Sequence, residues 1–238
     1  MNANEHPATY LETFDRSPGG WCGCDGNSDG LKALEHADGS ITSRSPWWVD
    51  YNHAPPGAGY LHIVFCLHTK GPFGEHLREV AGENHFASAG CPRDLRDARI
   101  TVRLKGEMEM RGGELVVLVQ SQIGDTVGGW LLTSQPLRIT SEGREQTITL
   151  VNDESQWTCL GARHDRGDFY AHHSLESVLR EVNTNIIFVL FPISVVPMGP
   201  IKGDVHFLRA GKDYPLWRSK LPEGYVSMDT IEIEFARN

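Results

Sequence analysis

No stretch of the sequence is rich in lysine or arginine, and none is long and apolar. The 22 Lys and Arg residues are outnumbered by 31 Asp and Glu residues, which gives a formal net charge of -9. Nucleic acid is therefore not an expected partner, because contact with a phosphate backbone needs clustered basic side chains. No apolar run approaches the roughly 20 residues of a membrane-spanning helix, so a membrane is not an expected partner either.

The N-terminal residues 1–7 lack the basic and then apolar pattern of a secretory signal peptide, and we expect a cytoplasmic protein. The five cysteines form an odd number without the spacing of a disulfide framework, which favours reduced thiols. Cys22 and Cys24 flank a glycine without the second close pair that is typical of structural zinc. Two loop cysteines are the simpler interpretation.

Several familiar catalytic motifs are missing as well. There is no Gly-rich phosphate loop before a helix, no Gly-x-Ser-x-Gly elbow and no His-Glu-x-x-His. We expect no organic cofactor. With 238 residues, 39% of them hydrophobic, the chain is long enough to bury a core. We expect one domain over residues 1–238, with residues 1–8 as a candidate disordered tail.

The sequence does contain many short segments with the two-residue alternation of β-strands, separated by turn clusters. In Tyr60–His68 the odd positions Leu61, Ile63, Phe65 and Leu67 are predicted to face the core, with the even positions opposite. The segment Asn185–Ile193 is apolar on both faces, as expected of a central strand. Further strands are expected at 100–105, 114–122, 137–139, 146–151 and 230–235, with a turn at 106–113.

Helical periodicity is scarce. In 174–182 apolar residues recur at i, i+3, i+4 and i+7 after Ser174, a typical N-cap residue, and 74–80 is a second candidate. The predicted fold class is all-β: an antiparallel jelly-roll β-sandwich with one or two short helical insertions.

Three short segments carry a resemblance to a known family. They are Phe14-Asp15 with Gly20-Trp21, the sequence Asp-Leu-Arg-Asp-Ala-Arg-Ile at 94–100, and Asp-Thr-Ile-Glu-Ile at 229–233. Together they resemble galactose-binding-like jelly-roll domains, many of which are carbohydrate-binding modules. The resemblance implies a concave sheet face that binds carbohydrate. It also implies a structural calcium ion, for which Glu12, Asp15 and Asp229 are the matching oxygen ligands; solvated acids at strand ends are the alternative.

The polar face of the 60–68 strand is the expected binding surface. His62, Cys66 and His68 should project from it, but His62 and Cys66 lie about 13 Å apart along an extended strand, too far to share a metal ion. A ligand-binding face is the more natural use, extended by Arg103, Gln120 and Gln122 and by His53 in the preceding loop. Indole and phenol rings stack on sugars, so Trp47, Trp48 and Tyr51 are candidates for stacking or for core packing.

The loop that contains Arg163, Tyr170, His172 and His173 is the best candidate for catalysis. An arginine can neutralise a uronate carboxylate while a histidine or tyrosine removes the α-proton, which is the chemistry of a polysaccharide lyase. A glycoside hydrolase is a related possibility, and the histidines can instead simply cap the following helix. Carbohydrate binding, carbohydrate-directed catalysis and protein assembly thus all remain hypotheses, and the oligomeric state is open.

Overall fold

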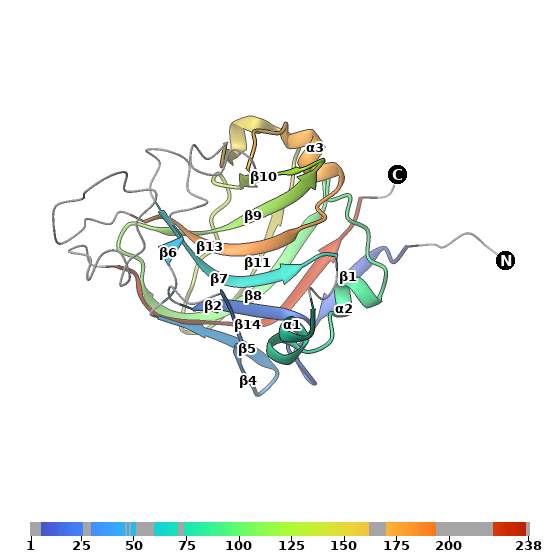
Figure 1. Ribbon diagram of the computed structural model, residues 1–238. Coiled ribbons are helices and arrows are strands. Elements are labelled where there is room, and N and C mark those ends of the chain that lie inside the picture. The colour runs from blue at the N-terminus through green and yellow to red at the C-terminus, as the bar shows by residue number, and fades with distance from the viewer. Residues whose placement is uncertain are drawn as a thin grey trace.

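The computed structural model describes residues 6–25, 30–45, 47, 49–50, 60–70, 74–161, 170–193 and 221–236. Its strands form two antiparallel sheets that pack face to face, with a few short helices around them (Figure 1). The predicted β-sandwich class is therefore confirmed. None of the described helices is long and apolar enough to cross a membrane.

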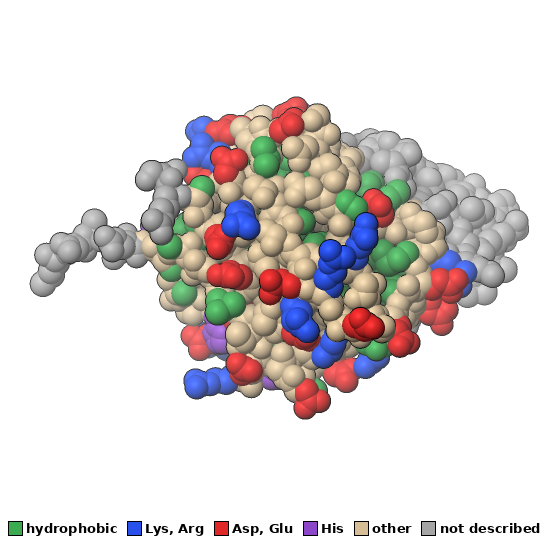
Figure 2. All heavy atoms as spheres, turned by 180° about the vertical axis from the view of Figure 1, so that it is seen from behind, with side chains coloured by type: hydrophobic (Ala, Val, Ile, Leu, Met, Phe, Trp, Pro, Cys, Tyr) green, Lys and Arg blue, Asp and Glu red, His purple; other side chains and the backbone are tan. Residues whose placement is uncertain are grey.

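The first sheet has six strands and one charged face. Its order is β11 (Arg144–Thr149), β8 (Arg99–Glu109), β14 (Glu223–Glu234), β5 (Ser40–Arg44) and β4 (Glu35–Ala37), and β1 (Thr9–Glu12) pairs with the last part of β14. Alternate residues of β8, such as Ile100 and Leu104, are buried, whereas Arg99 and Arg103 are exposed. Figure 2, which shows the side opposite to Figure 1, has acidic and basic side chains intermixed over the surface.

The second sheet has eight strands and is apolar on both faces. Its order is β12 (Thr158–Cys159), β10 (Thr126–Leu131), β9 (Glu114–Ile123), β13 (Asn185–Ile193), β7 (Tyr60–His68), β2 (Trp21–Asp25) and β3 (Gly30–Lys32), and β6 (Val49–Asp50) pairs with β7. Val117 and Phe188 belong to the main core, whereas Leu118 and Ile187 belong to a separate buried cluster. Since residues next to each other in a strand face opposite ways, this second cluster lies on the outer face.

A β-bulge in β7 changes which residues share a face. Phe188 pairs with Phe65 but the next residue, Val189, pairs with Ile63, so one residue of β7 is extra at this point. Val64 and Phe65 are consecutive, yet both belong to the core between the sheets. The two-residue alternation is therefore inverted on the N-terminal side of the bulge, where Leu61 and Ile63 face outward with the second cluster.

The helices are short. They are α1 (Gly74–Ala81), α2 (His85–Ser88), α3 (Leu175–Arg180) and the 3-10 turn η1 (Glu154–Gln156). Ser174 caps α3 by accepting a hydrogen bond from the amide of Ser177, which confirms the expected helix and its cap. The segment 137–139 forms only a single bridge, and the predicted turn at 106–113 is wrong in its first half because β8 continues to Glu109.

Candidate functional site

A cleft of about 1210 Å³ is lined in part by the residues that precede β1 and those that follow β14. The segment before β8 forms one wall, and α3 with its flanking residues forms another. The polar side chains that line the cleft are those of His6, Arg93, Asp94, Arg96, Asp97, Asn152, Glu176 and Glu181. Part of the 94–100 segment that carries the family resemblance thus borders a cleft.

A guanidinium group between two acids organises this cleft. Arg96 donates from Nε and Nη2 to the two carboxylate oxygens of Asp94 at 2.9 and 2.5 Å, and from Nη1 to Glu176 at 2.9 Å. Asn152 donates to the other oxygen of Glu176 at 2.5 Å. The hydrogen bonds from Arg96 lower the pKa of Asp94, and those from Arg180 and Arg96 lower the pKa of Glu176. Both acids are therefore held ionised and fixed in direction.

The acidic side chains that line the cleft outnumber its arginines by four to two. Arg93 pairs with Glu181 at 2.9 Å, so each arginine that lines the cleft has an acidic partner. Asp97 is exposed at a positive φ of 57° and forms no ion pair within the described part of the chain. Burial raises the pKa of the Cys91 thiol to about 11, so this sulfur in the cleft wall stays protonated. The cleft offers paired donors and acceptors without an excess of positive charge.

The residues expected on a concave sheet face are only partly brought together. Trp47 is 5% exposed, donates from Nε1 to Ser43 at 2.9 Å and belongs to the core between the sheets. His62 is 1% exposed and its ring centre lies 6.1 Å from that of Trp47. The expectation that His62 shares a face with Cys66 and His68 is wrong, because the bulge in β7 turns it inward.

Other predicted binding residues are also separated. Gln120 is buried on β9, whereas Gln122 near the end of the same strand is exposed and exchanges backbone hydrogen bonds with the Asn183 side chain. Arg103 lies on the outer face of the other sheet, where it contacts Asp229 at 3.4 Å, so it does not extend the face of β7. Trp48, Tyr51 and His53 lie outside the described residues. Their binding roles stay predictions.

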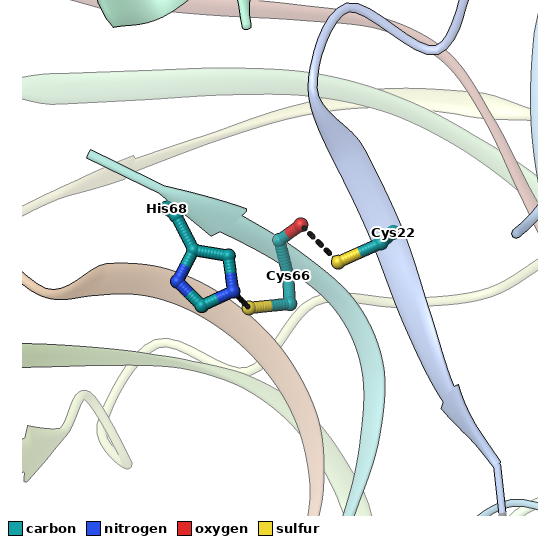
Figure 3. A group of neighbouring side chains, drawn as sticks. All are labelled: Cys22, Cys66 and His68. Carbon is teal, nitrogen blue, oxygen red and sulfur yellow. Dashed lines mark hydrogen bonds between the residues drawn. The ribbon is translucent and has the colours of Figure 1, made fainter. Parts of the chain in front are cut away.

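Two thiols and an imidazole come together on the eight-stranded sheet (Figure 3). The sequence predicted that two of them, Cys66 and His68, share a strand face. Cys22 on β2 is paired directly with Cys66 on β7, and His68 follows two residues later. The Cys22 thiol donates to the backbone carbonyl oxygen of Cys66 at 3.5 Å. The interaction of the two side chains lowers the pKa of Cys22 and raises that of Cys66. Cys22 was missed because the glycine in β2 made this strand resemble a loop.

The predicted catalytic loop is described only from residue 170 onward, and Arg163 lies outside the described residues. Tyr170 forms a bridge with Val127, and His173 lies 2.8 Å from the hydroxyl of Thr126. The exposed His172 packs edge-on against Trp130, with ring centres 6.0 Å apart. These contacts dock the segment on β10, and catalysis here stays a prediction.

The three predicted calcium ligands have separate partners. Glu12 lies 2.7 Å from His85, Asp15 accepts a hydrogen bond from Thr13 at 2.6 Å, and Asp229 contacts Arg103 and Lys105. Within the described ranges, the only group of three or more His, Cys, Asp or Glu side chains with metal-ligand spacing is the thiol and imidazole group. The carboxylates of Glu12, Asp15 and Asp229 do not form such a group, and calcium binding stays a prediction.

Comparison of the chain with protein-family models, with curated proteins and with solved structures finds no match. The function is therefore inferred from the geometry of this chain.

Proposed function

We propose that this chain is a glycan-binding β-sandwich of the galactose-binding-like kind and that a neutral saccharide is held in the terminal cleft. The observation that supports this most strongly is the fixed network around Arg96. A sugar hydroxyl both donates and accepts hydrogen bonds, so it pairs well with a surface where carboxylates alternate with guanidinium and amide groups.

The charge balance of the cleft favours a neutral ligand over an acidic one. Arg93 and Arg96 are each engaged by acids, and Asp97 adds a further negative charge. A uronate or phosphate would have to compete with Asp94 or Glu176 for the guanidinium of Arg96. Neutral hydroxyls can instead use the remaining lone pairs and N–H groups of the network without separating any charged pair.

This location differs from the concave sheet face that the sequence predicts. Trp47 and His62 lie inside the sandwich and cannot stack on a sugar without unfolding. The cleft between the segment before β8 and α3 has the convergent polar groups that ligand sites usually have, and at about 1210 Å³ it is somewhat larger than most of them.

Calorimetric titration of the full chain with neutral and acidic oligosaccharides tests the proposal. Asp97→Asn keeps the shape of the side chain and tolerates the left-handed backbone, and it should weaken glycan binding about tenfold by removing a charged acceptor. Asp38→Asn is the matched control, since Asp38 is also exposed and has a φ of 51° but lies in the β4–β5 turn.

The expected result is that a neutral glycan binds and that Asp38→Asn leaves its affinity unchanged. Absence of binding to any glycan would overturn the proposed function. Equal affinities of the two variants would remove the cleft as the binding site.

A further inference from the structure

Two neighbouring strands bring a pair of cysteines and a histidine together on the outer face of the eight-stranded sheet. Cys22 on β2 is directly opposite Cys66 on β7, and directly opposed residues of antiparallel strands have Cβ atoms about 4.5–5.5 Å apart. His68 follows Cys66 by two residues and therefore points to the same face. In Figure 3 the three side chains converge, one from β2 and two from β7.

The spacing of the three side chains fits metal coordination. Their ligand atoms, two sulfurs and one ring nitrogen, all lie within 4.8 Å of one another. The sulfur of Cys66 is 3.8 Å from Nε2 of His68. In a tetrahedral zinc site, neighbouring sulfur and nitrogen ligands are about 3.5–3.8 Å apart, so side-chain adjustments of about 1 Å or less would place all three on one ion.

The surroundings of the group decide which ion it would accept. Cys22 is 0% and Cys66 is 3% exposed, and both belong to the same buried cluster as Leu77 and Ala81 of α1. Two thiolates neutralise a divalent ion, so the filled site has no net charge and can be buried among apolar side chains. Sulfur and imidazole ligands favour zinc over calcium or magnesium, which prefer oxygen.

The backbone of His68 is held in place from outside the sheet. Asn84, itself 6% exposed, donates from Nδ2 to the carbonyl oxygen of His68 at 2.6 Å. The Oδ1 atom of the same side chain accepts the amide of Ala87 and so caps α2. The end of β7 is thereby tied to a helix, which limits the positions that the imidazole can take.

We propose that Cys22, Cys66 and His68 form a binding site for a zinc ion. Binding replaces the two thiol protons, which leave to solvent, by two Zn–S bonds, the imidazole nitrogen supplies the third ligand, and a water molecule completes the tetrahedral ion. This site is separate from the terminal cleft and does not depend on glycan binding. Cys24 lies two residues from Cys22 on the same strand and belongs to the same buried cluster, so it has to be tested separately.

The experiment is a titration of the reduced, chelator-treated full chain with Co²⁺, followed by displacement with Zn²⁺. We expect one ion per chain, thiolate-to-cobalt charge-transfer absorption, and the visible bands of a tetrahedral ion. Metal binding should be weakened at least about 100-fold by each of the substitutions Cys22→Ser, Cys66→Ser and His68→Gln. Changes to groups that only support a metal ligand can already reach this size. Cys159→Ser, which removes a half-buried thiol elsewhere, should bind as the wild type does.

A second measurement uses only the wild-type chain and remains decisive if a variant does not fold. In dilute urea, where local opening exposes buried thiols, bound Zn²⁺ should slow the reaction of Cys22 and Cys66 with a thiol reagent, as identified by peptide mass spectrometry, and leave the labelling of Cys159 unchanged. The proposal is overturned if no charge-transfer band appears, if the Cys22 and Cys66 variants bind like the wild type, or if these cysteines form a disulfide in the purified protein. The assignment of ligands would also be overturned if Cys24→Ser lost metal binding while Cys22→Ser kept it.

Discussion

The carboxylate of Glu12 on β1 lies 2.7 Å from Nδ1 of His85, the first residue of α2. The side chain of Glu12 is 8% exposed, and its other oxygen accepts the amide of Phe14 at 3.3 Å. A buried acid with two partners thus connects the first strand to α2, the second helix after β7. This contact joins segments 73 residues apart in the sequence.

Removal of this acid should destabilise the fold. Glu12→Ala leaves the amide of Phe14 and the ring of His85 without their acceptor, which should lower the free energy of unfolding by about 3 kcal/mol. Glu35→Ala is the matched control, because Glu35 forms a 2.9 Å ion pair with Arg44 in which both side chains are more than half exposed. Its cost should stay below about 1 kcal/mol. Urea denaturation measures the free energy of unfolding of both variants. Equal losses of stability would contradict the view that burial makes the Glu12 contact stronger than an exposed ion pair.

The same carboxylate occupies the space that a side chain at Gly19 would need. A Cβ atom at this position would lie 2.1 Å from Oε2 of Glu12, and the φ angle is +62°. Gly90 has a similar φ of +65° with nothing within 4 Å. Both alanine variants pay about 1–2 kcal/mol for the left-handed backbone, but only Gly19→Ala also displaces Glu12. Gly19→Ala should therefore be the less stable variant, and adding Glu12→Ala should recover part of the difference.

The strands that sequence patterns predicted well are those without glycine. Tyr60–His68 and Asn185–Ile193 match β7 and β13 because both are rich in β-branched and aromatic residues, which favour strands. β10 was not predicted because Gly128 and Gly129 weaken the strand pattern. The structure explains the pair: a Cβ on Gly128 would lie 2.9 Å from His173, and one on Gly129 would lie 2.8 Å from Leu160.

The candidate sites were harder to predict than the strands. A single inserted residue at the β7 bulge reverses the side of the sheet that His62 faces, and nothing in the local sequence signals the bulge. The pairing of Cys22 with Cys66 joins strands 44 residues apart, which no local pattern contains. The terminal cleft similarly depends on contacts such as that between Arg96 and Glu176, 80 residues apart in the sequence.

The opposite environments of His62 and His68 can be tested by truncation. His62→Ala removes a 1% exposed ring that packs on Trp47, so the cavity should cost about 2–4 kcal/mol. His68→Ala, in metal-free protein, removes a half-buried ring and should cost about 1 kcal/mol or less. Denaturation monitored by tryptophan fluorescence measures both. Equal, small effects would mean that His62 also faces outward.

The ion pair of Asp94 should make stability depend on pH. Arg96 lowers the pKa of Asp94 in the folded state. The ion pair therefore stabilises the protein fully at pH values above the pKa of Asp94 in the unfolded chain, near 3.9. The stabilisation is lost as the pH falls through the lower pKa of the folded state. Asp94→Asn should thus cost up to about 1 kcal/mol at neutral pH and nothing in strong acid. Denaturation at a series of pH values shows whether the stabilities of the wild type and of Asp94→Asn become equal in acid. Asp125→Asn, in the exposed β9–β10 turn, controls for loss of one surface charge.

The thiol of Cys91 should report on the terminal cleft through its alkylation rate. Burial raises its pKa to about 11, so each pH unit between 8 and 10 should increase the thiolate fraction, and the rate with iodoacetamide, about tenfold. A cysteine with an ordinary pKa near 8.5 would instead reach a plateau in this range. Peptide mass spectrometry distinguishes Cys91 from the other thiols. A plateau near pH 9 would contradict the buried environment, whereas slower labelling in the presence of a neutral glycan would locate that glycan in the cleft that Cys91 lines.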